Sequence, residues 1–579
     1  MCYTFKEYKE EQNMMKFNEF TYKRPDYEVY KKDFLALVEQ LKAAESLEEV
    51  KDAIDRVSEL SASLESMGTL ASIRNSIDTR DEFYDEEDNY WNEYSPLYQE
   101  LSTTYYKAVM DSPYLNELKE HYPRTYFQYM DYELKAFDSS VIELLQKENQ
   151  LSSDYQKLLA SAKIEFDGKT LTLSQFGPYL QSTDRAVRKA ATDAHLSFFK
   201  ENEEKLDAIY DEMVKVRDTI AKELGYQDFV ELGYIRMKRF DYDRENVEVY
   251  RKQVLEYVVP ITEKLAKRQA ARIGIDDMKH YDSALQFLDG NPVPQGDPDY
   301  IIENGRKMYH ELSDETAEFI DFMFDKELVD LLSKEGKAGG GYCTYIPEYD
   351  SPFIFANFNG TSGDIDVLTH EAGHAFQVYE SRWVKQPELA FPTYETCEIH
   401  SMSMEFFTYP WMELFFKDQT EKYKFDHLSS TIRFLPYGVL VDHFQHEVYE
   451  NPEWSPAERK AAWRRLEKQY IPHRDYSEES FLDEGTFWYR QGHIFASPFY
   501  YIDYTLAQIC ALQFFKRAIV DKDELAWADY LAICQAGGTK SFLETVEMAN
   551  LRSPFEEGSL ADVIQTIDET LEAVDDANL

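Results

Sequence analysis

The sequence is poor in cysteine and has no long apolar run. Five cysteines occur in 579 residues, none of them in a Cys-x-x-Cys pair: Cys2, Cys343, Cys397, Cys510 and Cys534. Such scattered cysteines are typical of reduced thiols, so we expect a cytoplasmic protein without disulfides. No stretch approaches the roughly 18 apolar residues of a membrane-spanning helix. The polar start MCYTFKEYKEEQ lacks the apolar core of a signal peptide. We therefore expect neither a membrane protein nor a secreted disulfide scaffold.

Basic residues are also scarce relative to acidic ones. The chain has 62 Lys and Arg against 109 Asp and Glu, a net charge of −47. Nucleic acids and anionic membranes bind positively charged surfaces, so we expect neither as a partner. The hydrophobic content of 43% and the aromatic content of 15% are typical of a globular chain. The length favours two or more domains.

Helical periodicity dominates the first part of the chain. From Tyr27 to about Leu158, apolar residues recur at spacings of three and four, with short connections and little proline. Asp167-Gly168 between alternating residues predicts a β-hairpin. We interpret residues 1–200 as an N-terminal helical lobe and residues 201–579 as a second domain that holds the motifs described next. The segment from Asp289 to Pro298 is the clearest linker-like loop. These patterns predict a mainly α fold.

A His-Glu-x-x-His motif occurs at His370, Glu371 and His374. Residues four apart share a helical face, so both imidazoles can point at one Zn²⁺. Glu371, about 100° around the helix from His370, can reach a water there without ligating the ion, as a general base should. A chance match is expected at most roughly 0.05 times in a chain of this composition, which leaves two unrelated histidines on a structural helix as the weaker alternative. We predict one catalytic zinc per chain, which requires a third protein ligand.

Two familiar sources of a third ligand are excluded. In a metzincin the motif continues to a Gly and a third His, but here Gln377 and Glu380 occupy those positions. The inverted zinc motif is absent as well, because the run His443 to Glu447 has the wrong order. We interpret that run as a helix surface. The remaining option is a carboxylate from the next helix.

The next helix is predicted from Tyr394 towards Phe416, with a kink at Pro410, and carries Glu395, Glu398 and Glu405. Glu398 and Glu405 are seven residues apart and share a face. We assign Glu398 as the third ligand and Glu405 as the acceptor for the N–H of a ligand imidazole, which would fix its tautomer. Helix geometry alone leaves Glu395 open as the alternative ligand.

A strand is predicted over Pro352 to Phe358 (PFIFANF), just before the zinc helix. A short strand in this place can pair with the extended backbone of a peptide substrate. We therefore predict Phe355 and Ala356 as substrate-binding residues. The alternative is a small structural sheet packed under the helix.

The motif and the acidic helix together resemble a known family. HEAGH, followed 24 residues after His374 by the Glu of CEIHSMSMEF, resembles the thimet oligopeptidase and oligoendopeptidase F family, and most of all its Pz-peptidase-like branch. The resemblance extends roughly from Leu173 to the C-terminus. It implies two helical lobes around a deep substrate channel, one zinc ion, and cleavage of short peptides at internal bonds. Carried over by motif, it implies His370, His374 and Glu398 as metal ligands and Glu371 as the base.

Hydrogen-bond donors to the oxyanion are expected near the C-terminal end of the chain. Tyr501 and Tyr504, or Tyr500 and Tyr504, share a helical face, although aromatics at this spacing are more often core residues. The resemblance implies a His followed by tyrosines that donate to the oxyanion, here His493, Tyr501 and Tyr504. The thimet oligopeptidase branch has its first such tyrosine where this chain has Pro498, which leaves open whether Tyr500 or Tyr501 faces the zinc. We also predict Tyr500 as a substrate-binding residue.

We predict a cytoplasmic zinc metalloendopeptidase that hydrolyses short oligopeptides. Glu371 would take a proton from water and pass it to the leaving amine. One alternative is a helical zinc carboxypeptidase or dipeptidyl carboxypeptidase. It would need a basic group to grip the terminal carboxylate, and no arginine near the motifs stands out as that group. The other alternative is a peptide-binding scaffold with a structural zinc. It would need a fourth protein ligand, such as Cys397 or His400, and neither is well directed on the helix.

Overall fold

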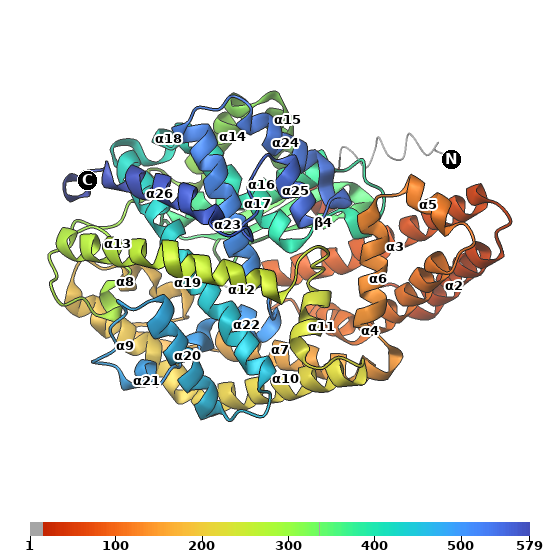
Figure 1. Ribbon diagram of the computed structural model, residues 1–579, viewed down its shortest axis with the longest axis horizontal. Helices are drawn as coiled ribbons and strands as arrows, with labels where there is room; N and C mark the ends of the chain where they lie inside the picture. Colours follow the sequence, from red (N-terminus) through yellow and green to blue (C-terminus); the bar gives the residue numbers. More distant parts are fainter. Residues whose placement is uncertain (1–14, 335) are drawn as a thin grey trace. The chain divides into compact units, whose positions relative to one another are not determined.

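Helices make up most of the structure, a computed structural model that describes residues 15–334 and 336–579 (Figure 1). This confirms the predicted mainly α fold; the substrate channel stays a prediction. Cys2 and the N-terminal segment considered for a signal peptide lie outside the described residues. The other four cysteines are thiols, as the sequence predicted. Within the described ranges, no helix is both long and apolar enough to cross a bilayer.

Tertiary contacts divide the chain into two units, each built from three separate segments. Unit 1 consists of Met1–Ser139, Pro294–Phe415 and Lys522–Asn550, and unit 2 of Ser140–Val293, Phe416–Asp521 and Leu551–Leu579. One boundary falls inside the predicted linker-like loop, between Val293 and Pro294. The sequence, by contrast, predicts a single division of the chain, after residue 200. The assignment of residues 201–579 to a catalytic domain stays a prediction.

Unit 1 begins with antiparallel helices whose apolar faces form one core. Its helices are α2 (Tyr27–Ala43), α3 (Leu47–Ile77), α4 (Glu82–Met110), α5 (Leu115–His121), α6 (Arg124–Ala136), α14 (Pro298–Leu312), α15 (Asp314–Asp325), α16 (Gly363–Glu380), α17 (Tyr394–Phe407), α24 (Ala526–Ala536) and α25 (Phe542–Met548), while α18 (Glu413–Phe416) ends at the boundary. The side chains of Asp26 and Ser46 cap the backbone N–H groups at the starts of α2 and α3. Phe34 and Leu41 of α2 and Ile54 of α3 are buried in the shared core, because the three- and four-residue spacing directs them to one face.

A three-stranded sheet precedes the helix that carries the His-Glu-x-x-His motif. Its strands are β3 (Val329–Leu332), β4 (Tyr342–Ile346) and β5 (Ser351–Phe358), in the order β3-β5-β4. The central strand β5 runs parallel to β3 and antiparallel to β4. Seven of its eight residues are buried, as its nearly continuous apolar sequence predicts for a strand covered on both faces. The sheet leads directly into α16.

The start of α16 is fixed by an acidic side chain. The carboxylate of Asp364 accepts hydrogen bonds from the backbone N–H groups of Asn359 and Gly360, each at 2.8 Å. Ser362, the residue preceding the helix, makes no capping bond with its side chain. The loop between β5 and the metal-binding motif is therefore held by Asp364.

Helices α16 and α17 pack so closely that only glycine fits between them at residue 373. A Cβ atom at Gly373 would lie 2.6 Å from the carbonyl oxygen of His400 and 2.6 Å from Cα of Ser401. The small residues of the motif thus allow the backbones to approach. Helix α17 ends at Phe407, and a 3₁₀ turn over Tyr409–Trp411 separates it from α18. The helix predicted towards Phe416 with a kink at Pro410 is therefore interrupted at that proline and not merely kinked. The break coincides with Pro410, which cannot supply a helical N–H.

Unit 2 is helical apart from one small hairpin. Its helices are α7 (Ile142–Ala160), α8 (Gly177–Leu180), α9 (Arg185–Glu201), α10 (Glu203–Glu223), α11 (Phe229–Arg236), α12 (Arg244–Gln253), α13 (Val259–Arg272), α19 (Thr420–Glu450), α20 (Pro456–Tyr470), α21 (Ser480–Asp483), α22 (Gly492–Ala496), α23 (Tyr501–Phe515) and α26 (Ser559–Glu572). The strands β1 (Ile164–Phe166) and β2 (Lys169–Leu171) pair antiparallel. This confirms the hairpin predicted at Asp167-Gly168.

The run from His443 to Glu447 lies on α19 and is only partly a helix surface. His446 is 3% exposed. Its Nε2 lies 2.9 Å from the hydroxyl of Tyr234 and its Nδ1 lies 3.2 Å from the carboxylate of Asp442. The surface interpretation is therefore wrong for His446, because its polar ring is buried between Asp442 of the same helix and Tyr234, which is distant in sequence.

Candidate active site

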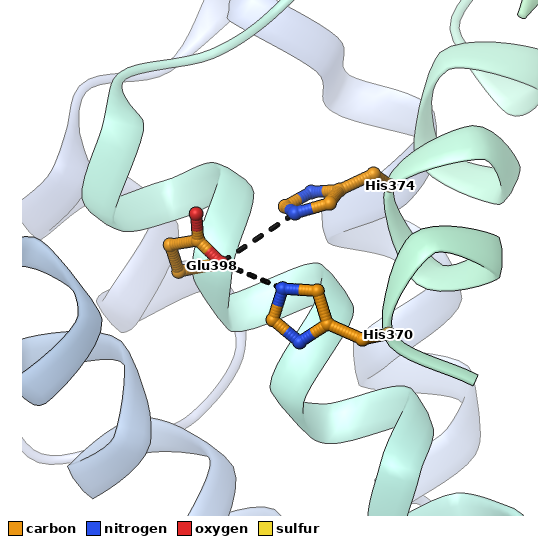
Figure 2. Close-up of side chains that lie close together, drawn as sticks. All are labelled: His370, His374 and Glu398. Carbon is orange, nitrogen blue, oxygen red and sulfur yellow. Dashed lines mark ion pairs between the residues drawn. The ribbon is translucent and has the colours of Figure 1, made fainter. Parts of the chain in front are cut away.

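Two histidines of α16 and one glutamate of α17 converge in unit 1 (Figure 2). One ligand atom from each of His370, His374 and Glu398 lies within 4.8 Å of the others. The Nε2 atoms of the two imidazoles lie 3.2 Å and 3.5 Å from Oε2 of Glu398. Two imidazole nitrogens and one carboxylate are a donor set that zinc takes in catalytic sites. The three residues brought together are those that the motif and the helix spacing predicted as ligands.

The orientation of the donors is fixed by neighbours on α17. Nδ1 of His370 lies 2.7 Å from Oε1 of Glu405, so the ring donates this N–H and presents Nε2 to Glu398. The hydroxyl of Ser401 donates to Oε2 of Glu398 at 3.0 Å. Glu405 was predicted for this contact. Ser401 was not, although its position three residues after Glu398 places both on one helical face.

Glu371 lies beside this group and is 7% exposed. Its Oε2 is buried and accepts no hydrogen bond from any residue that the structure describes. Burial raises the pKa of Glu371 above its ordinary value, although the nearby imidazoles of His370 and His374 oppose this. A buried carboxylate with an uncommitted oxygen can accept a proton from a small molecule placed next to it.

The charges of the convergent group stabilise one another. Burial opposes the charged form of His370, but hydrogen bonds to Glu398 and Glu405 outweigh it and raise its pKa well above the ordinary value. Burial also opposes ionisation of Glu398, but the imidazoles of His374 and His370 hold its pKa well below the ordinary value. The same negative field that favours a proton on His370 would favour a metal cation between the three residues.

Other polar residues of α17 lie outside the convergent group. Glu395, the alternative ligand, is fully buried but is not part of it. His400 and Cys397, considered as a fourth ligand, are not part of it either. His400 is fully buried, and burial followed by the charge of His374 lowers its pKa to about 3. The described residues therefore provide three protein donors for a metal and leave a further coordination position to a small ligand.

The predicted oxyanion donors lie together in unit 2. The hydroxyl of Tyr504 and Nε2 of His493 are 3.4 Å apart. The rings of Tyr500 and Tyr504 have centroids 4.8 Å apart, and those of His493 and Tyr501 5.0 Å apart. Burial raises the pKa of Tyr501 well above its ordinary value, so its hydroxyl stays protonated and can donate. Tyr500 and Tyr501 both adjoin the His493–Tyr504 pair, so the choice between them stays open.

His493 is oriented by two residues that sequence reasoning missed. The side-chain amide of Gln491 donates to Nδ1 of His493 at 2.8 Å, and its own carbonyl oxygen accepts from Tyr437 at 2.8 Å. An acceptor role at Nδ1 places the proton of neutral His493 on Nε2, where it can be donated. Gln491 is two residues from His493 and was visible in the sequence. Tyr437 lies on α19, and nothing in the sequence pointed to it.

The substrate-binding role predicted for Phe355 and Ala356 stays a prediction, although the place of β5 in the sheet opposes strand pairing with a substrate at Phe355. Both are fully buried in β5, and Phe355 is paired with Asp330 of β3 on one side and Tyr342 of β4 on the other. A central strand has no edge to offer a substrate. The position of β5 agrees with the alternative prediction, a structural sheet packed under α16. The adjacent edge strand is β4, and the preceding Gly341 lies so close to the motif that a Cβ there would be 3.4 Å from Oε1 of Glu371.

The structure is thus a helical protein with a convergent His-His-Glu group that could hold a metal ion. The profile of peptidase family M3 matches residues 178–292 and 298–563, and the profile of the peptidase M3 N-terminal domain matches residues 17–137. The chain belongs to peptidase family M3.

Individual proteins that resemble this chain are also named as peptidases of this kind. A solved structure of Pz peptidase A with an inhibitor is 52% identical, covers 97% of this chain and 100% of its own, and superposes with a TM-score of 0.95. A solved Bacillus anthracis protein, provisionally assigned as an oligoendopeptidase F, is 55% identical, with coverage of 98% and 99% and a TM-score of 0.91. An oligoendopeptidase F homologue from Lactococcus lactis is 23% identical over 59% of this chain. That match spans 60% of the length of the Lactococcus protein.

Proposed function

We propose that this protein is a zinc-dependent endopeptidase that hydrolyses internal bonds of short oligopeptides. One observation carries the proposal: ligand atoms of His370, His374 and Glu398 lie within 4.8 Å of one another, beside the buried, uncommitted Oε2 of Glu371. The oligopeptidase names of the relatives support the substrate class. The four thiols support a cytoplasmic location.

His370, His374 and Glu398 would hold one zinc ion, and the donor set fits it. A Zn²⁺ ion at this position supplies Lewis-acid chemistry, acidifying water and polarising a peptide carbonyl. Glu405 keeps His370 in the tautomer whose Nε2 can ligate, and Ser401 holds the carboxylate of Glu398. With three protein donors, the site has the composition of a catalytic centre. A scaffold with a structural zinc would require a fourth protein ligand.

Glu371 is the proposed general base. Its carboxylate takes a proton from the attacking water and delivers it to the amine that leaves. Burial of Glu371 raises its pKa, which increases its proton affinity and therefore its strength as a base. The nearby Gly341 leaves room on this side of the carboxylate, where a substrate backbone could pair along the edge strand β4.

Tyr504 and His493 are the proposed donors to the oxyanion, with Tyr501 or Tyr500 as a third. The Nε2–H tautomer that Gln491 favours in His493 makes this ring a donor at neutral pH. Hydrogen-bond donors held in place before the reaction stabilise the developing charge without reorganisation. This role rests on the family resemblance and on the donor chemistry of unit 2.

The experiment combines metal analysis with peptide hydrolysis. The wild-type protein and Glu371→Gln are purified and their zinc content is measured. Both are then assayed on an internally quenched oligopeptide with blocked termini, with product masses determined. We expect about one zinc per chain in both proteins and internal cleavage by the wild type alone. A wild-type protein that binds zinc but cleaves no short peptide would refute the proposal, and release of C-terminal residues only would identify a carboxypeptidase.

A further inference from the structure

Arg490 ends the 3₁₀ turn Phe487–Arg490 in unit 2 and is half-buried. Among the residues that the structure describes, none forms an ion pair or a hydrogen bond with its guanidinium. The charged group lies over aromatic rings instead, 4.1 Å from the centroid of Phe487 and 5.6 Å from that of Phe199. Ring faces attract a cation but do not neutralise it.

The carboxylate that lies near Arg490, that of Glu467, is already committed to other partners. Arg474 pairs with Glu467 at 3.0 Å. Glu467 is fully buried. It also accepts from the hydroxyl of Tyr476 at 2.8 Å and from Arg464 at 3.2 Å. Its two oxygens are thus occupied by these partners, and no carboxylate in the described part of the chain pairs with Arg490.

The charge of Arg490 persists at every ordinary pH. Burial lowers the pKa of Arg490, and the charge of Arg474 adds to this, but an arginine remains protonated in proteins. The effect on the surroundings is visible at His195, whose pKa is lowered to about 4 by burial and by Arg490. A shielded cation without a partner is costly, and the chain carries 109 acidic residues that could have supplied one. This arrangement suits an anion that arrives from outside.

We propose that Arg490 binds the C-terminal carboxylate of the peptide substrate. A guanidinium presents parallel N–H donors that match a carboxylate in a bidentate manner. Arg490 is followed by Gln491, which orients His493, and the Cα atoms of residues 490 and 493 lie at most roughly 11 Å apart. An extended peptide advances roughly 3.4 Å per residue. A peptide anchored at Arg490 therefore brings a bond a few residues from its C-terminus to His493. This rests on the proposed function.

The expectation that no arginine near the motifs stands out as a carboxylate-binding group is overturned only if the binding experiment below assigns that role to Arg490. Sequence position showed Arg490 as one residue in an aromatic segment, whereas the pairing of the nearby Glu467 with Arg474 is visible only in the folded unit 2. Anchoring by the C-terminus adds affinity for short peptides and leaves the cleaved bond internal.

The test measures binding without catalysis. Zinc-loaded Glu371→Gln protein is titrated calorimetrically with two peptides that differ only in a free or an amidated C-terminus. A third, amidated peptide carries one internal glutamate. Charged hydrogen bonds predict that the free acid binds about tenfold tighter or more than its amide. We expect this ratio to approach one when Arg490→Gln is added and to be reduced when Arg490→Lys is added, since lysine keeps the charge but loses the bidentate fork. The same ratio should survive in Arg552→Gln, because Arg552 is 53% exposed and already pairs with Glu556.

Three results would overturn or reassign the proposed role of Arg490. Equal affinity for acid and amide in the parent protein, or a ratio that Arg490→Gln and Arg490→Lys leave unchanged, would overturn the proposal. Tight binding of the internal-glutamate peptide that depends on Arg490 would assign the residue to acidic side chains and overturn the C-terminal assignment. Thermal unfolding verifies that Arg490→Gln is folded, and if it is not, Arg490→Lys decides. Because no hydrolysis is involved, failure here is distinct from failure of the peptidase assay.

Discussion

Replacing Glu405 by glutamine should weaken zinc binding without removing a ligand. The 2.7 Å contact between Glu405 and Nδ1 of His370 is a charge-assisted hydrogen bond, and the Glu405 side chain is only 11% exposed, so solvent screens it little. Glutamine keeps an acceptor oxygen but loses the negative charge. Loss of such a partner lowers metal affinity about 10- to 100-fold, or about 1.4 to 2.8 kcal/mol. The loss should be smaller than that caused by Glu398→Gln, which alters a direct donor.

The assay is competition for zinc with a chromophoric chelator, starting from metal-free protein. Glu395→Gln is the matched control, because Glu395 lies on the same helix, is fully buried and is outside the convergent group. Its zinc affinity should stay within about twofold of wild type, a factor that corresponds to less than 0.5 kcal/mol. The reasoning fails if Glu405→Gln binds zinc as tightly as wild type, or if Glu395→Gln loses as much affinity as Glu405→Gln.

Four further outcomes are expected. Glu371→Gln should lower kcat about 10²- to 10⁴-fold with full zinc content, and an activity near that of wild type would exclude the residue as the base. Tyr504→Phe should lower kcat about 10²- to 10³-fold with little change in KM, whereas a pure KM effect would indicate ground-state binding only. Gly373→Ala should cost about 1–3 kcal/mol in unfolding free energy, because its Cβ meets the His400 carbonyl at 2.6 Å; an unchanged Tm would contradict that contact. Burial raises the pKa of Glu371 above 4.5 and only its deprotonated form is a base, so kcat/KM should fall with decreasing pH at a midpoint above 4.5. An acid limb at or below that value would argue against a buried base.

Removal and replacement of the zinc ion should distinguish these variants. Dialysis against a chelator should abolish hydrolysis in the wild type, and added zinc should restore it. Glu405→Gln should need more zinc for the same recovery, whereas Glu371→Gln should bind zinc without recovering. The two variants thus separate holding the metal from transferring the proton.

Local chemistry was sufficient for the part of the site that lies within one helix. His370 and His374 share a face because they are four residues apart, and this geometry needs no information from the rest of the chain. The same holds for the hairpin at Asp167-Gly168, where the turn residues dictate the backbone. The mainly α fold followed from periodicity for the same reason.

Contacts between elements decided what remained. The choice of Glu398 over Glu395 depends on how α17 packs against α16, and Gly373 sets that approach through its missing Cβ. The central place of β5 depends on β3 and β4 adding to its two opposite edges. The sequence alone could therefore not show whether the strand that carries Phe355 is central or at an edge. The contact of His446 with Tyr234 is likewise set by a residue distant along the chain, and that Arg490 has no acidic partner among the described residues is visible only in the folded unit. Spacing along a helix is a local property, whereas pairing of charges and strands is decided only when distant segments meet.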